Sequence, residues 1–194
     1  MFTIGLTGDI ATGKSTVSRM LGERGALVID SDALTRELMQ PGTPTYRAVV
    51  ACFGDGILCP DGRLNRAALG QIVFSEPARL RELESLVHPA VAALREAKLR
   101  ASDAEVAVIE AVKLVEAGQH EGVDELWVVT STREVQLRRL LHDRGLSLED
   151  AERRLAAQPP TAAKLKLAAV VIQNNGTLAQ LRAEVERQWR RLTA

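Results

Sequence analysis

The sequence predicts an α/β fold in which a five-stranded parallel sheet is flanked by helices. Five short segments are apolar on both faces and rich in β-branched residues, as is typical of strands buried on both sides. Longer segments with apolar residues at helical spacing separate them. Strands and helices that alternate in this way form a parallel sheet between helical layers. The five segments are Phe2–Thr7, Ala26–Asp30, 104–111, Glu125–Ser131 and Ala168–Asn174.

Length and composition narrow the class of protein. The chain has 194 residues, enough for one good core and a small inserted subdomain. Its formal net charge is zero and only 3% of its residues are aromatic, which disfavours nucleic-acid binding. It has no apolar run long enough to cross a bilayer and no signal peptide, so we expect a cytoplasmic protein without membrane contacts. Cys52 and Cys59 suggest neither a disulfide framework nor a zinc site.

Two long helical stretches lie between the strands. The first, about residues 33–102, is too long for a single crossover helix and predicts a helical insertion. The second, about residues 133–166, lies between the fourth and fifth strands and carries several arginines. The core of the single domain is then expected to comprise about residues 1–32, 103–132 and 167–194.

The strongest motif runs from Gly8 to Ser15 and fits the pattern G-x-x-x-x-G-K-[ST] of a phosphate-binding loop. An apolar strand precedes it and a helical pattern follows, as the motif requires. Glycines allow the backbone N–H groups to turn inward around a phosphate, and the helix N-terminus points at the same anion. We expect Lys14 to reach the β- and γ-phosphates of a nucleoside triphosphate, and the Ser15 hydroxyl to ligate Mg²⁺.

Asp9 is unexpected in this loop, because a carboxylate inside a phosphate cradle is unfavourable. We expect its side chain to point outward, to solvent or to a partner arginine.

Two acids follow the second strand. Asp30 and Asp32 are two residues apart at the end of an extended segment, where ligands of open parallel sheets bind. A carboxylate at this place can accept the proton of a hydroxyl that attacks a phosphoryl group. The alternative is that Ser31 or Asp32 only caps the next helix, and the residues alone do not separate the two.

A resemblance to a known family rests on these motifs and on five further ones. They recur in the same order and spacing in dephospho-CoA kinases, over nearly the whole chain. The further motifs are PGTP (41–44), DGRLNRAAL (61–69), IVF (72–74), LVHPAV (86–91) and VVIQNNGT (170–177).

The resemblance implies a P-loop, nucleoside-monophosphate-kinase-like fold with a helical acceptor-binding domain and a mobile lid. The first helical stretch, about residues 33–102, corresponds to the acceptor-binding domain, and the second, about residues 133–166, to the lid. It also implies that the chain uses ATP and Mg²⁺ to phosphorylate the ribose 3′-hydroxyl of dephospho-CoA. Its partners would then be two small molecules, ATP and dephospho-CoA.

The same resemblance implies roles for individual residues. It makes Asp32 the general base and places His88 in contact with the acceptor, with Arg66 and Thr7 as weaker candidates. The residues alone leave another interpretation of His88, as part of a helix start with Pro89 in the first turn.

The resemblance also predicts which residues of the lid and of the adenine site contact ATP. It implies that Arg139 closes on the transferring phosphates and that Asn174 and Gly176 lie near the adenine. The family commonly reads Arg-Asp after this arginine where this chain reads Asp143-Arg144, so we take Arg144 as a second lid candidate. The residues expected to hold the ATP phosphates are Gly8, Ala11, Thr12, Gly13, Lys14, Ser15 and Thr16.

Departures from the family pattern add two expectations. The family usually has glycine where this chain has Ala11, so we expect an ordinary negative φ there, with the methyl group beside the phosphates. Lys113 stands in an otherwise apolar run and either contacts the acceptor or extends to water.

Two other functions are compatible with the fold. One is a kinase of the same architecture that acts on a nucleoside monophosphate, shikimate or gluconate. The other is a nucleotide-binding switch, although the chain lacks a guanine-reading Asn-Lys-x-Asp segment.

Overall fold

The computed structural model describes residues 1–193, and the chain divides into two compact units. The first comprises Met1–Ile29 and Asp103–Ala194 and contains the sheet. The second, Asp30–Ser102, is built from helices. No helix within the described residues is both long and apolar enough to cross a membrane.

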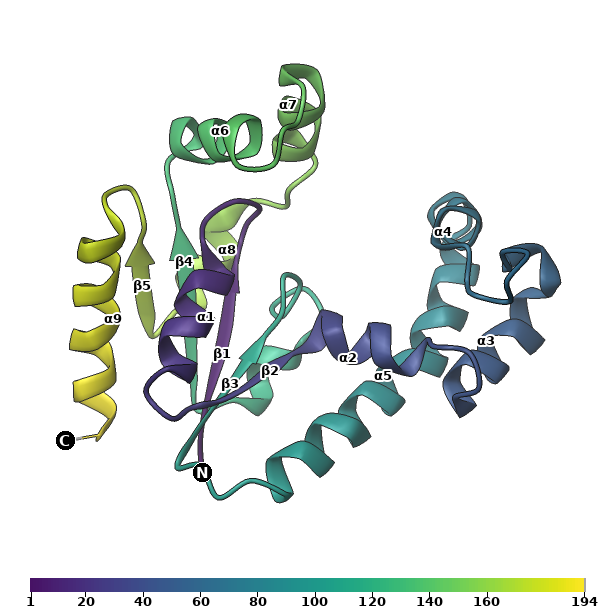
Figure 1. Cartoon of the computed structure of the whole chain (residues 1–194), viewed down its shortest axis with the longest axis horizontal. Coiled ribbons are helices and arrows are strands. Elements are labelled where there is room, and N and C mark those ends of the chain that lie inside the picture. The colour runs from purple at the N-terminus through teal and green to yellow at the C-terminus, as the bar shows by residue number, and fades with distance from the viewer. Residues whose placement is uncertain (194) are drawn as a thin grey trace. The chain divides into compact units, whose positions relative to one another are not determined.

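The sheet has five strands in the order β2-β3-β1-β4-β5 (Figure 1). The prediction of a five-stranded parallel sheet is confirmed. Strand β1 lies between β3 and β4, and Leu6 is opposite Glu110 on one side and Trp127 on the other. The strands are β1 (Phe2–Gly8), β2 (Leu27–Asp30), β3 (Val106–Glu110), β4 (Glu125–Thr130) and β5 (Val170–Gln173).

The strand order explains where a ligand can bind. After β1 the chain crosses to β2 at one edge, and after β3 it crosses to β4 on the other side of β1. The connections therefore run in opposite directions around β1, which makes the carboxyl end of β1 a topological switch point. The loop from Gly8 to Gly13 leaves the sheet at this point.

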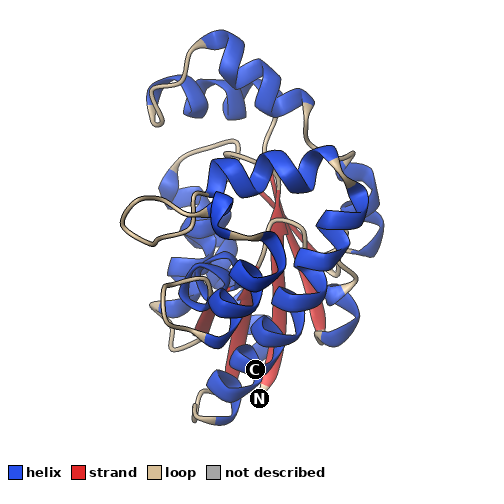
Figure 2. Ribbon diagram, turned by 90° about the vertical axis from the view of Figure 1, so that its right-hand side faces the viewer, coloured by secondary structure: helices blue, strands red, loops and turns tan. Residues whose placement is uncertain are grey.

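The core of the first unit has two layers of apolar side chains, and helices flank the strands (Figure 2). On one face, Ile4 and Leu6 are fully buried against residues of α1 and α9. On the other, a Cβ at Gly5 would lie 2.6 Å from the Leu114 side chain, so a larger residue there would displace this buried leucine. The helices of this unit are α1 (Lys14–Gly22), η2 (Gln119–Gly122), α6 (Arg133–His142), α7 (Leu148–Ala156), α8 (Thr161–Leu167) and α9 (Leu178–Thr193).

In the second unit, the long helix α5 packs against α2, α3 and α4. Two of the sequence motifs begin helices here. The Thr43 side chain accepts a hydrogen bond from the Tyr46 N–H at the start of α3, and Asn65 accepts one from Ala68 at the start of α4. The elements are α2 (Ser31–Leu38), α3 (Pro44–Phe53), η1 (Asp55–Ile57), α4 (Arg66–Ser75) and α5 (Pro77–Arg100).

An ion pair ties the last helix to the sheet at the start of β4. The Arg191 guanidinium donates to both carboxylate oxygens of Glu125, and the indole N–H of the fully buried Trp127 donates to Oε2 of Glu125 at 2.8 Å. The hydrogen bond from Arg191 is the main cause that lowers the pKa of Glu125. The charged carboxylate is therefore favoured by folding.

We predict that Glu125→Gln lowers the free energy of unfolding at pH 7 by about 1 kcal/mol, since solvent screens the half-exposed Arg191. A carboxyl group whose pKa falls on folding stabilises the native state above its unfolded pKa, and this stability is lost as the pH falls through the folded value. The difference between the two proteins should therefore shrink in urea unfolding curves taken below the ordinary pKa of 4.5. A difference that stays constant with pH would contradict this account.

Candidate active site

The loop between β1 and α1 has free backbone N–H groups. Ala11 and Gly13 both have positive φ, +59° and +92°. Within residues 1–193 their N–H groups have no acceptor, and those of Lys14 and Ser15 lie in the first turn of α1, where no intrahelical acceptor exists. Converging free N–H groups at a helix N-terminus form a site for an anion such as phosphate.

The outer side of the same loop is bound by side chains that come from far along the chain. These side chains are amides or a guanidinium, and each satisfies a backbone group of the loop. Gln136 donates to the Ile10 carbonyl at 2.8 Å, Gln158 accepts from the Ile10 N–H at 3.3 Å, Arg139 donates to the Ala11 carbonyl at 3.0 Å, and Asn174 donates to the Thr12 carbonyl at 2.8 Å. These four hydrogen bonds therefore fix the backbone of the loop.

The expectation of a negative φ at Ala11 is wrong. The left-handed conformation costs a residue with a Cβ about 1–2 kcal/mol. Two contacts offset this cost: the Arg139 hydrogen bond to the Ala11 carbonyl, and packing of the buried Ala11 against Leu140 and Leu155. The backbone of Ala11 can then turn as a glycine would.

Arg139 reaches three acceptors at once. Besides Ala11, its guanidinium donates to the Ser131 hydroxyl at 3.0 Å and to the Asn174 carbonyl at 2.9 Å. Burial, with a smaller contribution from Arg138, lowers the pKa of Arg139. The side chain connects α6 to the phosphate loop and to the loop after β5.

Lys14 and Ser15 share one carboxylate. The Lys14 ammonium is 2.6 Å from Oε1 of Glu110, and the Ser15 hydroxyl donates to the same oxygen at 3.0 Å. Glu110 is buried at the carboxyl end of β3, beside β1. This residue is not among those predicted from the sequence, although an acid that ends an apolar strand of a parallel sheet is a signal for a ligand site.

Close contacts explain both glycines of the motif. A Cβ at Gly8 would lie 2.5 Å from the Val129 carbonyl oxygen, and a Cβ at Gly13 would lie 2.2 Å from Nδ2 of Asn174. Thr12 is buried and its hydroxyl donates to the Asp9 carbonyl at 2.9 Å. The Thr16 N–H donates to the Gly13 carbonyl at 3.0 Å, which closes the first turn of α1.

Asp9 points outward, as expected, but its partner is neither solvent nor an arginine. Oδ1 of Asp9 is 2.8 Å from the ammonium of Lys164 on α8. The expectation fails because a lysine 155 residues away in sequence is brought under the loop by the fold.

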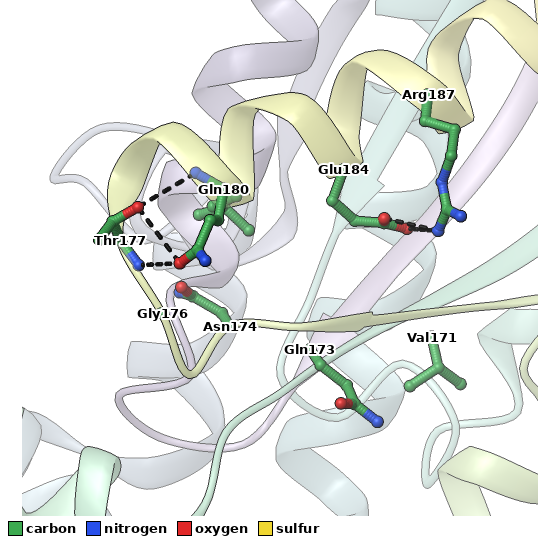
Figure 3. A pocket seen from close by; sticks show the side chains of 9 residues that line it. Val171, Gln173, Asn174, Gly176, Thr177, Gln180, Glu184 and Arg187 are labelled. Atoms are coloured by element: carbon green, nitrogen blue, oxygen red, sulfur yellow. Dashed lines mark hydrogen bonds and ion pairs between the residues drawn. The ribbon is translucent and has the colours of Figure 1, made fainter.

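The loop after β5 lines a hollow of about 310 Å³ between β5 and α9 (Figure 3). Asn174 and Gly176 are on its wall, and a Cβ at Gly176 would lie 2.1 Å from Oε1 of Gln180. The Asn174 amide, however, is turned to the phosphate loop, where it donates to the Thr12 carbonyl. The wall of the hollow contains no residue of the phosphate loop.

Thr7 supports the site without facing a ligand. It is fully buried, and its hydroxyl donates to the Val112 carbonyl at 3.0 Å. The expectation that Thr7 contacts the acceptor stays a prediction, to which this buried side chain lends no support. The neighbouring Lys113 is exposed, as a side chain that extends to water would be.

In the second unit, Asp30 at the end of β2 and Asp32 just after it have different structural roles. Asp30 is the N-cap of α2: its carboxylate accepts from the Asp32 N–H at 2.8 Å and the Ala33 N–H at 3.1 Å. The alternative in which Ser31 or Asp32 caps the helix is therefore wrong. Asp32 is exposed, and within residues 30–102 its carboxylate has no hydrogen-bond or ion-pair partner.

The remaining predicted site residues are exposed. Arg66 begins α4, and His88 lies in the middle of α5. Pro89 is inside that helix, so the interpretation of His88-Pro89 as a helix start is wrong. Arg144 lies exposed between α6 and α7, and within the described part of the first unit it has no partner.

Comparison with known sequences decides which family has this combination of loop and second unit. A sequence profile described as dephospho-CoA kinase matches residues 2–180. A dephospho-CoA kinase of Geobacter sulfurreducens is 51% identical over 192 residues, which cover 97% of this chain and 98% of the relative. The chain belongs to the dephospho-CoA kinase family. A further dephospho-CoA kinase, from Symbiobacterium thermophilum, is 48% identical over 98% of this chain and 81% of its own length.

Solved structures agree with membership of the dephospho-CoA kinase family. TT1252 from Thermus thermophilus has a TM-score of 0.87 and 34% identity, and the match covers 100% of this chain and 98% of that one. The dephospho-CoA kinase from Campylobacter jejuni has a TM-score of 0.70 and 25% identity, over 98% and 96% of the two chains. A shikimate kinase from Bacteroides thetaiotaomicron has a TM-score of 0.55 at 15% identity, over 100% and 99%, which shows a shared fold.

We predict that Gly13→Ala lowers the free energy of unfolding by about 2–4 kcal/mol and weakens binding of ADP with Mg²⁺ by about 100-fold or more. A methyl group there adds a clash with Asn174 to the strain of a positive φ. Gly25→Ala is the matched control, because Gly25 has φ +95° with nothing within 4 Å of its Cβ position. In the control, the free energy of unfolding should fall by about 1 kcal/mol and the affinity for ADP should not change. Equal effects of the two substitutions, in urea unfolding and calorimetry, would contradict the role of the Gly13–Asn174 contact.

Proposed function

We propose that the chain transfers the γ-phosphoryl group of ATP to the ribose 3′-hydroxyl of dephospho-CoA, giving CoA and ADP. The observation that carries the proposal is the set of free N–H groups of the phosphate loop, beside Lys14. Membership of the dephospho-CoA kinase family supports the choice of acceptor.

Lys14 is held ready for the phosphates. In the structure its ammonium is neutralised by Glu110, at the end of the strand next to the loop. A triphosphate that enters the loop offers Lys14 a second anionic partner, and the loop N–H groups bind the same phosphate oxygens. Gly13, Ser15 and Thr16 belong to the first turn of the helix that points at this anion.

Ser15 and Glu110 fit a site for Mg²⁺. The hydroxyl and the carboxylate lie within 3.0 Å of each other and supply the hard oxygen atoms that this ion prefers. Groups of three or more His, Cys, Asp or Glu that could hold a metal are absent from residues 1–193. This agrees with an ion that takes few protein ligands and completes its shell with phosphate oxygens and water. When bound, Mg²⁺ supplies positive charge to the β- and γ-phosphates.

Asp32 is the residue that we assign as general base. Asp30 is occupied by the helix cap and by an ion pair with Arg36, whereas the Asp32 carboxylate is exposed and unpaired within its unit. In the reaction, a bond forms between the 3′-oxygen and the γ-phosphorus as the bond from that phosphorus to the ADP oxygen breaks. Asp32 accepts the hydroxyl proton.

The two lid candidates take different parts in this proposal. Arg139 already makes three hydrogen bonds to the protein, so we assign it to holding the phosphate loop. Arg144 is exposed and has no partner in the described part of its unit, so it is free to bind the transferring phosphate. A guanidinium that reaches this phosphate stabilises the charge of the transition state.

Arg66 and His88 are the residues we assign to the acceptor. Both are exposed on helices of the second unit, at the start of α4 and within α5. The guanidinium of Arg66 suits a phosphate of dephospho-CoA, and the imidazole of His88 can donate or accept a hydrogen bond.

The acceptor is tested by measuring ADP release with ATP and Mg²⁺ across a panel of hydroxyl acceptors. The panel contains dephospho-CoA, adenosine, AMP, CMP, shikimate and gluconate, and mass spectrometry identifies the product. We expect dephospho-CoA alone to gain one phosphoryl group. Turnover only on another acceptor would contradict dephospho-CoA as the substrate, although the protein would still be a kinase. ADP binding without turnover on any acceptor would favour a nucleotide-binding switch.

We predict that Asp32→Asn reduces kcat by roughly 10²–10⁴, the usual effect of losing a general base, while binding of ATP is retained. Asp30→Asn is the control, because asparagine keeps an oxygen that can cap α2. The control should retain most of its turnover. Near-normal turnover of Asp32→Asn in steady-state kinetics would remove Asp32 from the mechanism.

A further inference from the structure

Lys164 on α8 is a buried cation outside the residues that the proposed reaction uses. Its side chain is only 1% exposed. The ammonium lies 2.8 Å from Oδ1 of Asp9 and 3.3 Å from Oε1 of Glu116, which is itself 31% exposed. A charge this deeply buried is costly unless it is paired, so the three side chains form one electrostatic unit.

Both carboxylate oxygens of Asp9 are bound by α8. Oδ1 pairs with Lys164, and Oδ2 accepts a hydrogen bond from the Thr161 hydroxyl. The Asp9 side chain is 9% exposed. Asp9 directly follows Gly8, so α8, at the C-terminal end of the stretch expected to form the lid, fixes the side chain at the start of the phosphate loop.

The position of Asp9 creates an electrostatic conflict. The loop N–H groups are arranged to attract an anion, and a buried carboxylate in the same loop repels one. Lys164 cancels that charge, and its contacts keep the carboxylate on the outer side of the loop. Without Lys164, the carboxylates of Asp9 and Glu116 would both lose this cation as a partner.

We propose that Lys164 is a positioning residue for the phosphate loop, which keeps the loop receptive to a nucleotide by neutralising Asp9 and holding it outward. The proposal rests on the nucleotide binding assigned above, but not on the identity of the acceptor. It makes α8 a determinant of nucleotide affinity, although Lys164 itself does not touch the phosphates.

The charges predict opposite effects for the two members of the pair. Lys164→Met leaves the Asp9 carboxylate uncompensated, so the Kd for ADP with Mg²⁺ should rise by about tenfold or more. Asp9→Asn leaves Lys164 with Glu116 as its partner and removes a negative charge from the loop, so the Kd should stay unchanged or fall. Both substitutions should lower the melting temperature, because each leaves a buried charge with one partner fewer.

The experiment is calorimetric titration of ADP in the presence of Mg²⁺ into the whole chain and four variants. These are Lys164→Met, Asp9→Asn, the double variant and Lys166→Met, whose lysine is exposed on the same helix and serves as the charge control. We expect the double variant to regain affinity to within about threefold of the unsubstituted chain, and Lys166→Met to bind normally. If Lys164→Met does not fold, Asp9→Asn and the double variant carry the test.

Equal loss of affinity in Asp9→Asn and Lys164→Met, with additive loss in the double variant, would overturn the proposal, because the pair would then be only structural. ADP binding by the unsubstituted chain without transfer to dephospho-CoA would overturn the proposed acceptor, and the expected pattern of Kd values would still support Lys164. Failure of the unsubstituted chain to bind ADP would overturn both.

Discussion

The structure of the first unit depends on one constraint: a loop that binds a phosphate must turn its N–H groups inward, and its outward-facing polar groups then need partners. Helices α6, α7 and α8 with their connections, and the loop after β5, supply these partners through Gln136, Arg139, Gln158 and Asn174. Each bond to a loop carbonyl or N–H satisfies a group that would otherwise be buried without a partner. The loop is thus held in its conformation without a nucleotide, by side chains that follow β4 in the sequence.

The same constraint explains how this loop functions with two unusual residues. Ala11 adopts a left-handed conformation because Arg139 and neighbouring apolar side chains stabilise it, and Asp9 is tolerated because Lys164 neutralises it. Glu110 meets the corresponding need on the inner side, where it balances Lys14 while no phosphate is present. The charges of Asp9 and Lys14 are each balanced, and a nucleotide that binds in the loop is expected to replace only Glu110, as the partner of Lys14.

Local patterns made the sheet and the phosphate loop predictable, because strand periodicity and the glycine–lysine spacing depend on neighbouring residues only. Predictions that depended on distant contacts or on backbone detail were less successful. The φ of Ala11 could not be read from the sequence, since a side chain 128 residues away stabilises it, and Lys164 was missed for the same reason. The cap of α2 was placed one or two residues too late, because only the backbone conformation of Asp30 identifies it as the N-cap.

The most direct test of this account is a crystal structure of the chain with ADP and Mg²⁺. We expect the ammonium of Lys14 to leave Glu110 for a phosphate oxygen, and the N–H groups of Ala11 and Gly13 to bind the nucleotide. We also expect the side-chain hydrogen bonds to the loop backbone, above all those from Arg139, to remain as they are. A loop that rearranges and breaks those bonds when ADP binds would contradict the claim that the loop is already held in this conformation without a nucleotide.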